Sequence, residues 1–182
     1  IPLDEVEILY TDRGTYLPIL YEESRVFSSA EGFDEGLPAT FADGIPVSYS
    51  RPGRALAEWI TWIHEGFPQV RFARLIQDGL LKHENEDIPS YELSALFRSL
   101  RIGIGRDRYP VIILGEIKAL KRRLKHADEE TEPLLRKRLA GLASLDLLCL
   151  GILGSIPLEN SDPCAVFESA VRFVDEFCRK EN

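Results

Sequence analysis

The sequence contains no methionine, and it has only three cysteines and three histidines in 182 residues. Zinc sites need closely paired Cys or His ligands, whereas Cys149, Cys164 and Cys178 lie 14 or 15 residues apart. A sparse, odd set of cysteines also argues against a disulfide framework. We therefore expect buried free thiols, a reducing cytoplasmic location, no metal and no cofactor in this segment.

Long hydrophobic runs are missing as well. The most apolar stretch, residues 147–156, is interrupted by Gly151, Gly154 and Ser155 and is much shorter than a bilayer span. This predicts that no membrane is involved. The chain begins Ile1-Pro2 with neither a basic nor an apolar leader, so we expect an excised segment of a larger protein without a secretory signal.

The usual catalytic strings are absent. No G-x-x-x-x-G-K-[ST] string is available to cradle nucleotide phosphates, and no G-x-S-x-G string is available to present a nucleophile. The segment is therefore not expected to be catalytic by itself. The net charge of −8 means that any contact with DNA must be local, because the whole segment does not attract polyanions.

Apolar residues make up 45% of the chain, which is the composition of a packed domain. Residues 6–10 alternate in the manner of a strand, and residues 13–27 have helical spacing. Residues 39–42 and 47–49 are typical of two further short strands. The first fifty residues are thus predicted to be α/β.

After residue 51 the apolar residues recur at helical intervals. Helices are expected near residues 56–63, 70–81, 91–100, 106–126, 129–153 and 163–179. Pro52 suits a first turn, Ser90 is a candidate cap, and Asp162-Pro163 is a start signal. The prediction is a predominantly helical α+β fold, with an α/β part over residues 1–50 and a helical bundle over residues 51–182.

A Gly-Ile-Gly turn between two expected helices is the most informative string. Two glycines permit backbone angles that let amides converge near a helix start, where the helix dipole favours an anion. Such a turn can hold a DNA phosphate without reading sequence. The expected DNA-contacting residues are Arg101, Gly103, Ile104, Gly105, Arg106 and Arg108. The alternative is an ordinary turn between helices.

Residues 111–118 form an apolar run that ends in Glu-x-Lys, which resembles the way a PD-(D/E)XK nuclease presents its metal-binding carboxylate and lysine. In this alternative Glu116 and Lys118 are catalytic, and Asp107 or Asp87 supplies a second carboxylate. Against it, the apolar residues from Ile113 onward continue at helical spacing, which favours one amphipathic helix.

That helix carries a basic cluster on its expected solvent side. The cluster contains Lys118, Lys121, Arg122, Arg123 and Lys125. It is either a solvated charged face or a surface that contacts phosphates. A third functional alternative is a protein-interaction module, for which the acidic balance and the Trp59 and Trp62 pair are the hints, although core packing also explains two tryptophans three residues apart.

The Arg-x-Gly-Ile-Gly string resembles the duplex-binding turns in the accessory subdomain of UvrD-like superfamily 1 helicases. Residues 37–47, followed by Arg51-Pro52-Gly53-Arg54-Ala55-Leu56, resemble the segment of AddB-type helicase-nuclease subunits where the second motor lobe passes into its helical insertion. The resemblance implies that residues 6–27 belong to the motor-like lobe and that the rest forms the inserted accessory subdomain.

The same resemblance implies a parent protein that processes DNA ends in recombinational repair. That parent would be an ATP-dependent helicase and exodeoxyribonuclease, with its ATP and Mg²⁺ sites outside this segment. The partners implied are the backbone of double-stranded DNA, bound weakly and without sequence preference, the rest of the parent polypeptide, and a helicase-nuclease partner subunit.

Overall fold

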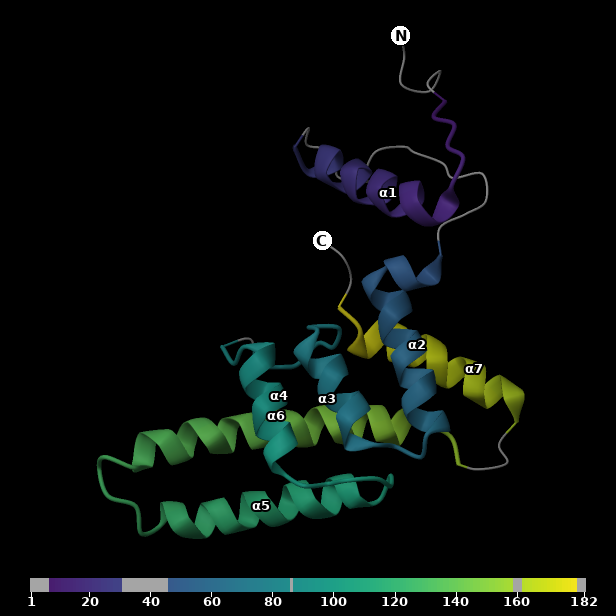
Figure 1. Ribbon diagram of the computed structural model, residues 1–182. Coiled ribbons are helices and arrows are strands. Elements are labelled where there is room, and N and C mark those ends of the chain that lie inside the picture. Colours follow the sequence, from purple (N-terminus) through teal and green to yellow (C-terminus); the bar gives the residue numbers. More distant parts are fainter. Residues whose placement is uncertain (1–6, 31–45, 86, 159–161, 180–182) are drawn as a thin grey trace. The chain divides into compact units, whose positions relative to one another are not determined.

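The computed structural model describes residues 7–30, 46–85, 87–158 and 162–179 (Figure 1). Within these residues the structure contains seven α-helices and no strand, and one isolated antiparallel bridge joins Leu81 to Cys178. The chain divides into two compact units, Ile1–Tyr49 and Ser50–Asn182. We refer to them as the N-terminal unit and the helical unit.

The N-terminal unit contains helix α1, Arg13–Ala30, and the 3-10 helix η2, Val47–Tyr49. Asp12 lies just before α1, where its carboxylate accepts hydrogen bonds from the Thr15 hydroxyl and from the Gly14 backbone N–H, the latter at 3.0 Å. These two bonds lower the pKa of Asp12 below its usual value, because they favour the charged carboxylate. The helix therefore begins with an acceptor for its free amides.

The predicted α/β character of residues 1–50 is wrong where it can be compared. Residues 7–10 have no regular structure, and residues 47–49 form a 3-10 helix in which the Tyr49 N–H donates to the Pro46 carbonyl at 2.9 Å. Val6 and residues 39–42 lie outside the described residues. An alternating apolar pattern becomes a strand only where a neighbouring strand completes its hydrogen bonds, and none is present among the described residues.

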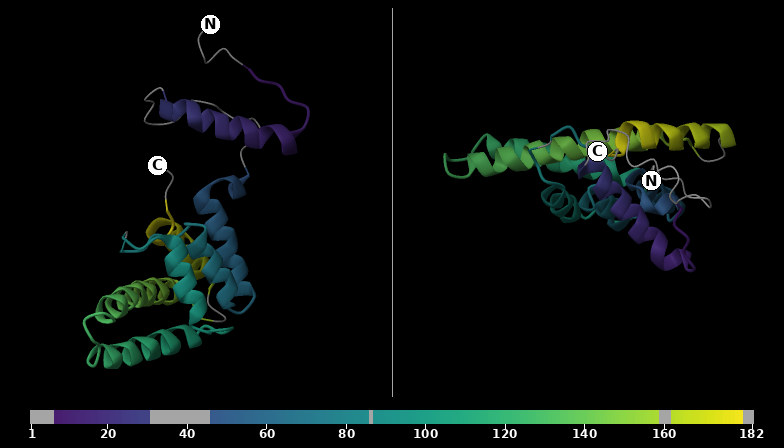
Figure 2. Two further views of the ribbon diagram at one scale, coloured as in Figure 1. Left: turned by 60° about the vertical axis from the view of Figure 1, so that its left-hand side comes forward. Right: turned by 90° about the horizontal axis from the view of Figure 1, so that it is seen from above.

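The helical unit bears out the predominantly helical class. Its elements are α2 (Arg51–His64), α3 (Gln69–Gln77), α4 (Ser90–Ser99), α5 (Arg108–Leu124), α6 (Glu132–Ser155), α7 (Pro163–Arg172) and a π-helical turn, η3 (Phe173–Phe177). Helices α5 and α6 run side by side as an antiparallel hairpin, and α3 packs against α4 (Figures 1 and 2). Helix α4 also packs on α6, so α6 is central to the unit.

Side-chain caps mark the starts of α2 and α7. The Ser50 hydroxyl oxygen accepts the Gly53 N–H at 3.0 Å, and the Asp162 carboxylate accepts the Cys164 N–H at 3.2 Å. Ser90 is not a cap, contrary to the prediction, because it is the first helical residue and Pro89 occupies the capping position. The helix expected over residues 163–179 is also shorter, because it passes into η3 after Arg172.

An aromatic cluster forms the centre of the helical unit. Trp62 donates its indole N–H to the Tyr109 hydroxyl at 2.9 Å, and that hydroxyl donates to the Phe67 carbonyl, also at 2.9 Å. Trp59 stacks on Phe173 with 5.0 Å between ring centroids. Trp59 and Trp62 are 2% and 0% exposed, so both pack in the core and neither is available as an interaction surface.

Helix α6 is the only described helix that is long and apolar enough to cross a membrane. However, Leu142, Leu145 and Ile152 on this helix are all completely buried within the unit. Helices α4 and α5 pack against it. Burial of one face by neighbouring helices accounts for part of the apolar composition of α6, whereas Leu134, Leu147 and Leu150 on the same helix are exposed.

Candidate phosphate-contacting surfaces

The predicted glycine turn joins α4 to α5, and it is hydrogen-bonded to the turn between α2 and α3. The Gly103 N–H donates to the Gln69 side-chain oxygen at 3.1 Å, and the Gly105 N–H donates to the Gly66 carbonyl at 3.1 Å. In return, the Gln69 backbone N–H donates to the Gly103 carbonyl at 2.7 Å. Both glycine amides that were predicted to hold a phosphate therefore have acceptors inside the protein.

The glycines are needed for the backbone conformation of this junction. Gly103 and Gly105 have φ values of 78° and 115°, and Gly66 in the facing turn has 77°. Only glycine adopts such angles without steric cost. The sequence pattern thus identified a specially shaped turn correctly, but the shape directs the amides to another turn of the same unit and not to solvent.

Arg106 is also used internally. Its guanidinium donates to the carbonyls of Leu153 at 2.6 Å, Ile156 at 2.8 Å and Pro157 at 3.3 Å. These carbonyls lie at and just beyond the end of α6, where a helix leaves acceptors without intrahelical partners. A cation is also favoured there by the helix dipole. Arg106 therefore caps α6, and it is not an outward-facing phosphate ligand.

The other predicted residues remain at the surface. Arg101 and Arg108 are exposed, and the Ile104 side chain is 62% exposed. The Arg108 guanidinium lies over the turn, because a Cβ built on Gly103 would be 3.5 Å from its Nη1 atom. The structure thus brings the predicted residues together in one turn, but the amide clamp on which the prediction rests is not formed.

The basic cluster lies on the outer face of α5. Lys118, Arg122 and Lys125 follow one another at i, i+4 and i+7, which places them on one side of a helix. All three are exposed, as are the flanking Lys121 and Arg123. The opposite side of α5 carries the buried residues Tyr109, Ile113, Ile117 and Leu120. We refer to Lys118, Lys121, Arg122 and Lys125 as the α5 basic face.

No ion pair involves the α5 basic face among the described residues. Some other cations of the helical unit are paired: Arg71 lies 2.6 Å from Glu65, and Lys137 lies 2.7 Å from Glu92. Arg136 likewise pairs with Glu132 one helical turn away. The face is therefore a local group of exposed cations, none of which has a carboxylate within ion-pair distance among the described residues.

The net negative charge of the chain comes from residues 1–49 and not from the helical unit. Residues 1–49 contain ten Asp and Glu against two Arg, and so they account for the whole net charge of −8. Residues 50–182 contain twenty acidic and twenty basic residues. Net charge therefore does not oppose the binding of a polyanion by the helical unit.

The nuclease alternative is contradicted by the structure. Residues 110–118 lie within α5 and do not form a strand. Residues two apart on a helix point to different sides, so Glu116 and Lys118 do not converge on one metal ion. The burial of Ile113 and Ile117 gives the reason, because their four-residue spacing forms the core stripe of a helix.

Two of the three free cysteines are buried. Cys149 and Cys178 are buried, and burial raises the pKa of Cys178 to about 11 and that of Cys149 as well, which favours the neutral thiol at neutral pH. Cys164 is exposed, contrary to expectation. Among the described residues, no three His, Cys, Asp or Glu side chains are grouped so as to hold a metal ion.

Comparisons with known proteins do not identify a relative. No protein-family model, curated protein or solved structure matches this chain.

Proposed function

We propose that the helical unit is a non-catalytic module that engages the backbone of double-stranded DNA through the α5 basic face. The observation that carries the proposal is the line of exposed cations on one side of α5 with no carboxylate paired to them in the described residues. Lysine and arginine contacts to phosphates supply most non-specific affinity for DNA. The α5 basic face replaces the glycine turn as the expected contact surface.

The spacing of the face suits a nucleic-acid backbone. Lys118 and Lys125 are separated by seven residues, which is about 10 Å along a helix axis. Along the duplex axis each strand presents one charge per roughly 3.4 Å, so the face spans about three phosphates of one strand. The unit would therefore bind weakly and without sequence preference, because phosphates carry no base information.

The local helix dipole is one explanation for these cations that competes with phosphate contact, besides a solvated charged face. Lys121, Arg122 and Arg123 lie in the last turn of α5, where positive charge stabilises the helix end. Lys118 lies before that turn, and the dipole effect fades within one turn, so it does not account for the whole line. Phosphate contact accounts for Lys118, Arg122 and Lys125 together.

The parent protein proposed is a DNA repair and recombination protein of the ATP-dependent helicase-exonuclease type. Support for this part comes from the two short strings around residues 37–56 and 101–105. ATP, Mg²⁺ and the catalytic domains would belong to the rest of that polypeptide. The helical unit would hold duplex DNA while the other parts, together with a partner subunit, act on its end.

A charge-reversal experiment tests the DNA role. The variant Lys118→Glu, Arg122→Glu, Lys125→Glu removes the line. The control Arg54→Glu, Arg74→Glu, Arg172→Glu makes the same change of charge at exposed positions on α2, α3 and α7. Affinity for a fluorescent duplex would be measured by anisotropy over a range of salt concentrations.

For the wild type we expect log affinity to fall with log salt at a slope of about −3, since three phosphates each contribute about −0.9. The α5 variant should lose this binding, and the control should keep most of it. Equal loss in both variants would contradict the proposal, because it would mean that only net charge matters.

A further inference from the structure

The outer side of α6 carries a second exposed surface, and this one is apolar. Five small or apolar residues follow one another at alternating spacings of three and four, which places them in one line along the helix: Ala140, Ala143, Leu147, Leu150 and Gly154. We refer to them as the α6 apolar stripe. Leu147 and Leu150 are 52% and 46% exposed, and a Cβ built on Gly154 would extend into open space. The described residues therefore leave most of the stripe uncovered.

Helix α6 is apolar on both of its sides. Leu145 and Ile152, on the side opposite the stripe, are completely buried, so the core of the unit is complete without the stripe. Between residues 139 and 155 the only charged residue is Asp146. A helix that is apolar all round is normally buried all round. The exposed second side thus indicates a surface that another molecule covers.

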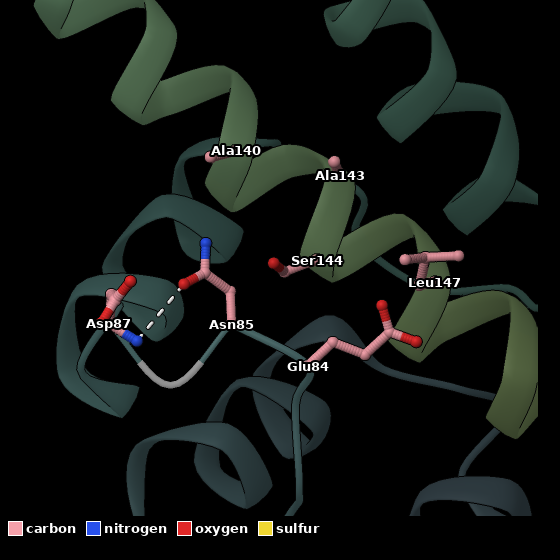
Figure 3. Close-up of a pocket in the computed structure, with 7 residues that line it drawn as sticks. All are labelled: Glu84, Asn85, Asp87, Ala140, Ala143, Ser144 and Leu147. Atoms are coloured by element: carbon pink, nitrogen blue, oxygen red, sulfur yellow. Dashed lines mark hydrogen bonds between the residues drawn. The ribbon is translucent and has the colours of Figure 1, made fainter.

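A cleft lies along one edge of the stripe (Figure 3). Ala140, Ala143 and Leu147 belong to its α6 wall, and the loop that precedes α4 contributes Glu84 and Asp87. Figure 3 shows these two acidic side chains at opposite ends of the cleft. Both are exposed, and neither takes part in an ion pair among the described residues. This edge of the stripe therefore carries two separate negative charges.

Asp146 lies at the other edge of the stripe. It is two residues from Ser144, which lines the cleft, so the two side chains point to different sides of α6. The Oδ1 atom of Asp146 is buried and accepts no hydrogen bond among the described residues. Burial raises the pKa of this carboxyl, because it disfavours the charged form. A buried carboxylate oxygen without a donor is unusual in a folded protein, and it indicates a place for a donor from another molecule.

These features favour an amphipathic helix with basic flanks as the occupant. Spacings of three and four residues, repeated over two heptads, form the pattern with which one helix packs against another. Lysine and arginine beside the apolar side of that helix would lie against the carboxylates at both edges. A second copy of this chain fits poorly, because its own stripe is flanked by Asp146 and the acidic loop. An anionic membrane fits poorly as well, since its surface repels acidic edges.

We propose that the α6 apolar stripe is a docking site for an amphipathic helix of a partner protein, with apolar residues on one side and basic residues on both flanks. The ends of the stripe are fourteen residues apart, which is about 21 Å of helix. Leu147 and Leu150 lie at its centre with small residues toward both ends, which leaves space for large apolar side chains of the partner. The inference does not rest on the DNA proposal, because the stripe and the α5 basic face share no residue.

The test uses synthetic helical peptides of about three heptads, with leucine at positions a and d and with lysine, glutamine or glutamate at positions e and g. Binding to the full 182-residue chain is measured by isothermal titration calorimetry. We expect saturable binding of the lysine peptide and about tenfold weaker binding of the glutamine peptide, because three carboxylates each contribute a factor of about two. The glutamate peptide should not bind. Absence of saturable binding of the lysine peptide up to about 1 mM would overturn the proposal.

A pair of double variants locates the apolar contact. Leu147→Ser with Leu150→Ser should weaken binding of the lysine peptide at least about tenfold, because two apolar side chains of the contact are lost. The control Val111→Ser with Leu114→Ser removes two exposed apolar side chains with the same spacing on α5, and it should leave binding unchanged. Equal losses in the two variants would contradict the docking site.

A pair of single variants locates the charged contact. Asp146→Asn keeps the shape of the side chain and removes its charge, so it should weaken binding of the lysine peptide about threefold and leave binding of the glutamine peptide unchanged. The control Glu116→Gln removes an exposed carboxylate from α5 and should affect neither peptide. Equal effects of the two substitutions would show that only net charge matters, and the role given to Asp146 would be wrong.

Two further measurements distinguish the other occupants. Binding of the chain to lipid vesicles that is lost with Leu147→Ser and Leu150→Ser would overturn the proposal in favour of a membrane surface. A dimer that is lost in the same variant, together with no peptide binding, would overturn it in favour of a second copy. Duplex affinity of this variant should equal that of the wild type, so failure of the DNA proposal and failure of the docking proposal are distinguishable.

Discussion

The glycine turn at residues 101–107 and the α5 basic face contain the same kinds of cationic residue, and the structure uses them differently. In the turn, the Arg106 guanidinium donates to three carbonyls near the end of α6, and the amides of Gly103 and Gly105 bond to the facing turn. On α5, the cations point to solvent and have no paired carboxylate in the described residues. The difference is whether oxygen acceptors of the same chain lie close enough to hydrogen-bond to the cationic side chains.

A phosphate-binding motif is therefore defined by hydrogen-bond donors that have no acceptor within the protein. A glycine-rich turn with flanking arginines can clamp an anion, or it can fasten two parts of a fold together. Here the second use is observed. Substitutions in the two regions can show whether the turn is structural and whether the α5 basic face is the part available to a ligand.

Replacing Arg106 with alanine should have the largest effect on stability. It leaves carbonyls at the end of α6 without their charged donor, and hydrogen bonds to charged groups contribute about 1.5–3 kcal/mol each. We expect the free energy of unfolding to fall by about 3 kcal/mol, measured by urea denaturation. Arg136→Ala, which removes an exposed pair with Glu132, should cost less than about 0.5 kcal/mol. Similar values for the two variants would show that the Arg106 cap is not important.

Tyr109→Phe should have the next largest effect on stability. The change keeps the buried ring but removes the hydroxyl that accepts from Trp62 and donates to the Phe67 carbonyl. Two buried polar groups then lose a partner, so we expect a loss of about 2 kcal/mol in urea denaturation. Tyr91→Phe is the matched control, because Tyr91 is 67% exposed and should change stability very little. A Tyr109 variant as stable as this control would contradict the role given to the hydroxyl.

Gln69→Ala tests directly whether an amide of the glycine turn can bind a phosphate once its internal acceptor is removed. It frees the Gly103 N–H and removes the donor to the Phe97 carbonyl at 2.6 Å. Two hydrogen bonds of this kind contribute about 1 kcal/mol each, so stability should fall by up to about 2 kcal/mol. Affinity for duplex DNA should not rise. Tighter DNA binding by this variant would mean that a freed glycine amide does act as a phosphate ligand.

Arg101→Gly should have the smallest effect and the opposite sign. Arg101 has a φ of 54°, a conformation that costs a non-glycine residue about 1 kcal/mol. The greater entropy of glycine in the unfolded chain offsets part of the gain, leaving a stabilisation of about 0.5 kcal/mol. Thermal unfolding would measure it, with Arg98→Gly within α4 as a destabilising control. A loss of stability at Arg101 would contradict the strain assigned there.

The helices of the 50–182 region were predictable because each buries one apolar stripe. Ile113, Ile117 and Leu120 on α5 have the spacing that predicts their burial, and all three are buried. The core role of Trp59 and Trp62 follows from the same reasoning. Residues 47–49 were not predictable in this way, because a three-residue apolar segment does not separate a strand from a tight turn.

The outcome at the glycine turn depended on contacts that sequence does not reveal. The acceptors of Gly103 and Gly105 come from Gln69 and Gly66, more than thirty residues away, and those of Arg106 come from residues 153–157. The positive φ values were foreseeable from the glycines themselves. The partners of the amides were not, since they depend on how two helix pairs pack together.

A comparison of two variants tests most directly whether the α5 basic face, and not the glycine turn, contacts duplex DNA. Lys118→Glu with Arg122→Glu alters the α5 basic face, and Arg101→Glu with Arg108→Glu alters the exposed arginines of the turn, so both variants carry the same net charge. We predict that duplex affinity falls strongly only in the first, with its salt slope reduced by about 2, because two phosphate contacts are lost. A greater loss in the second variant would contradict the account and return the contact surface to the turn.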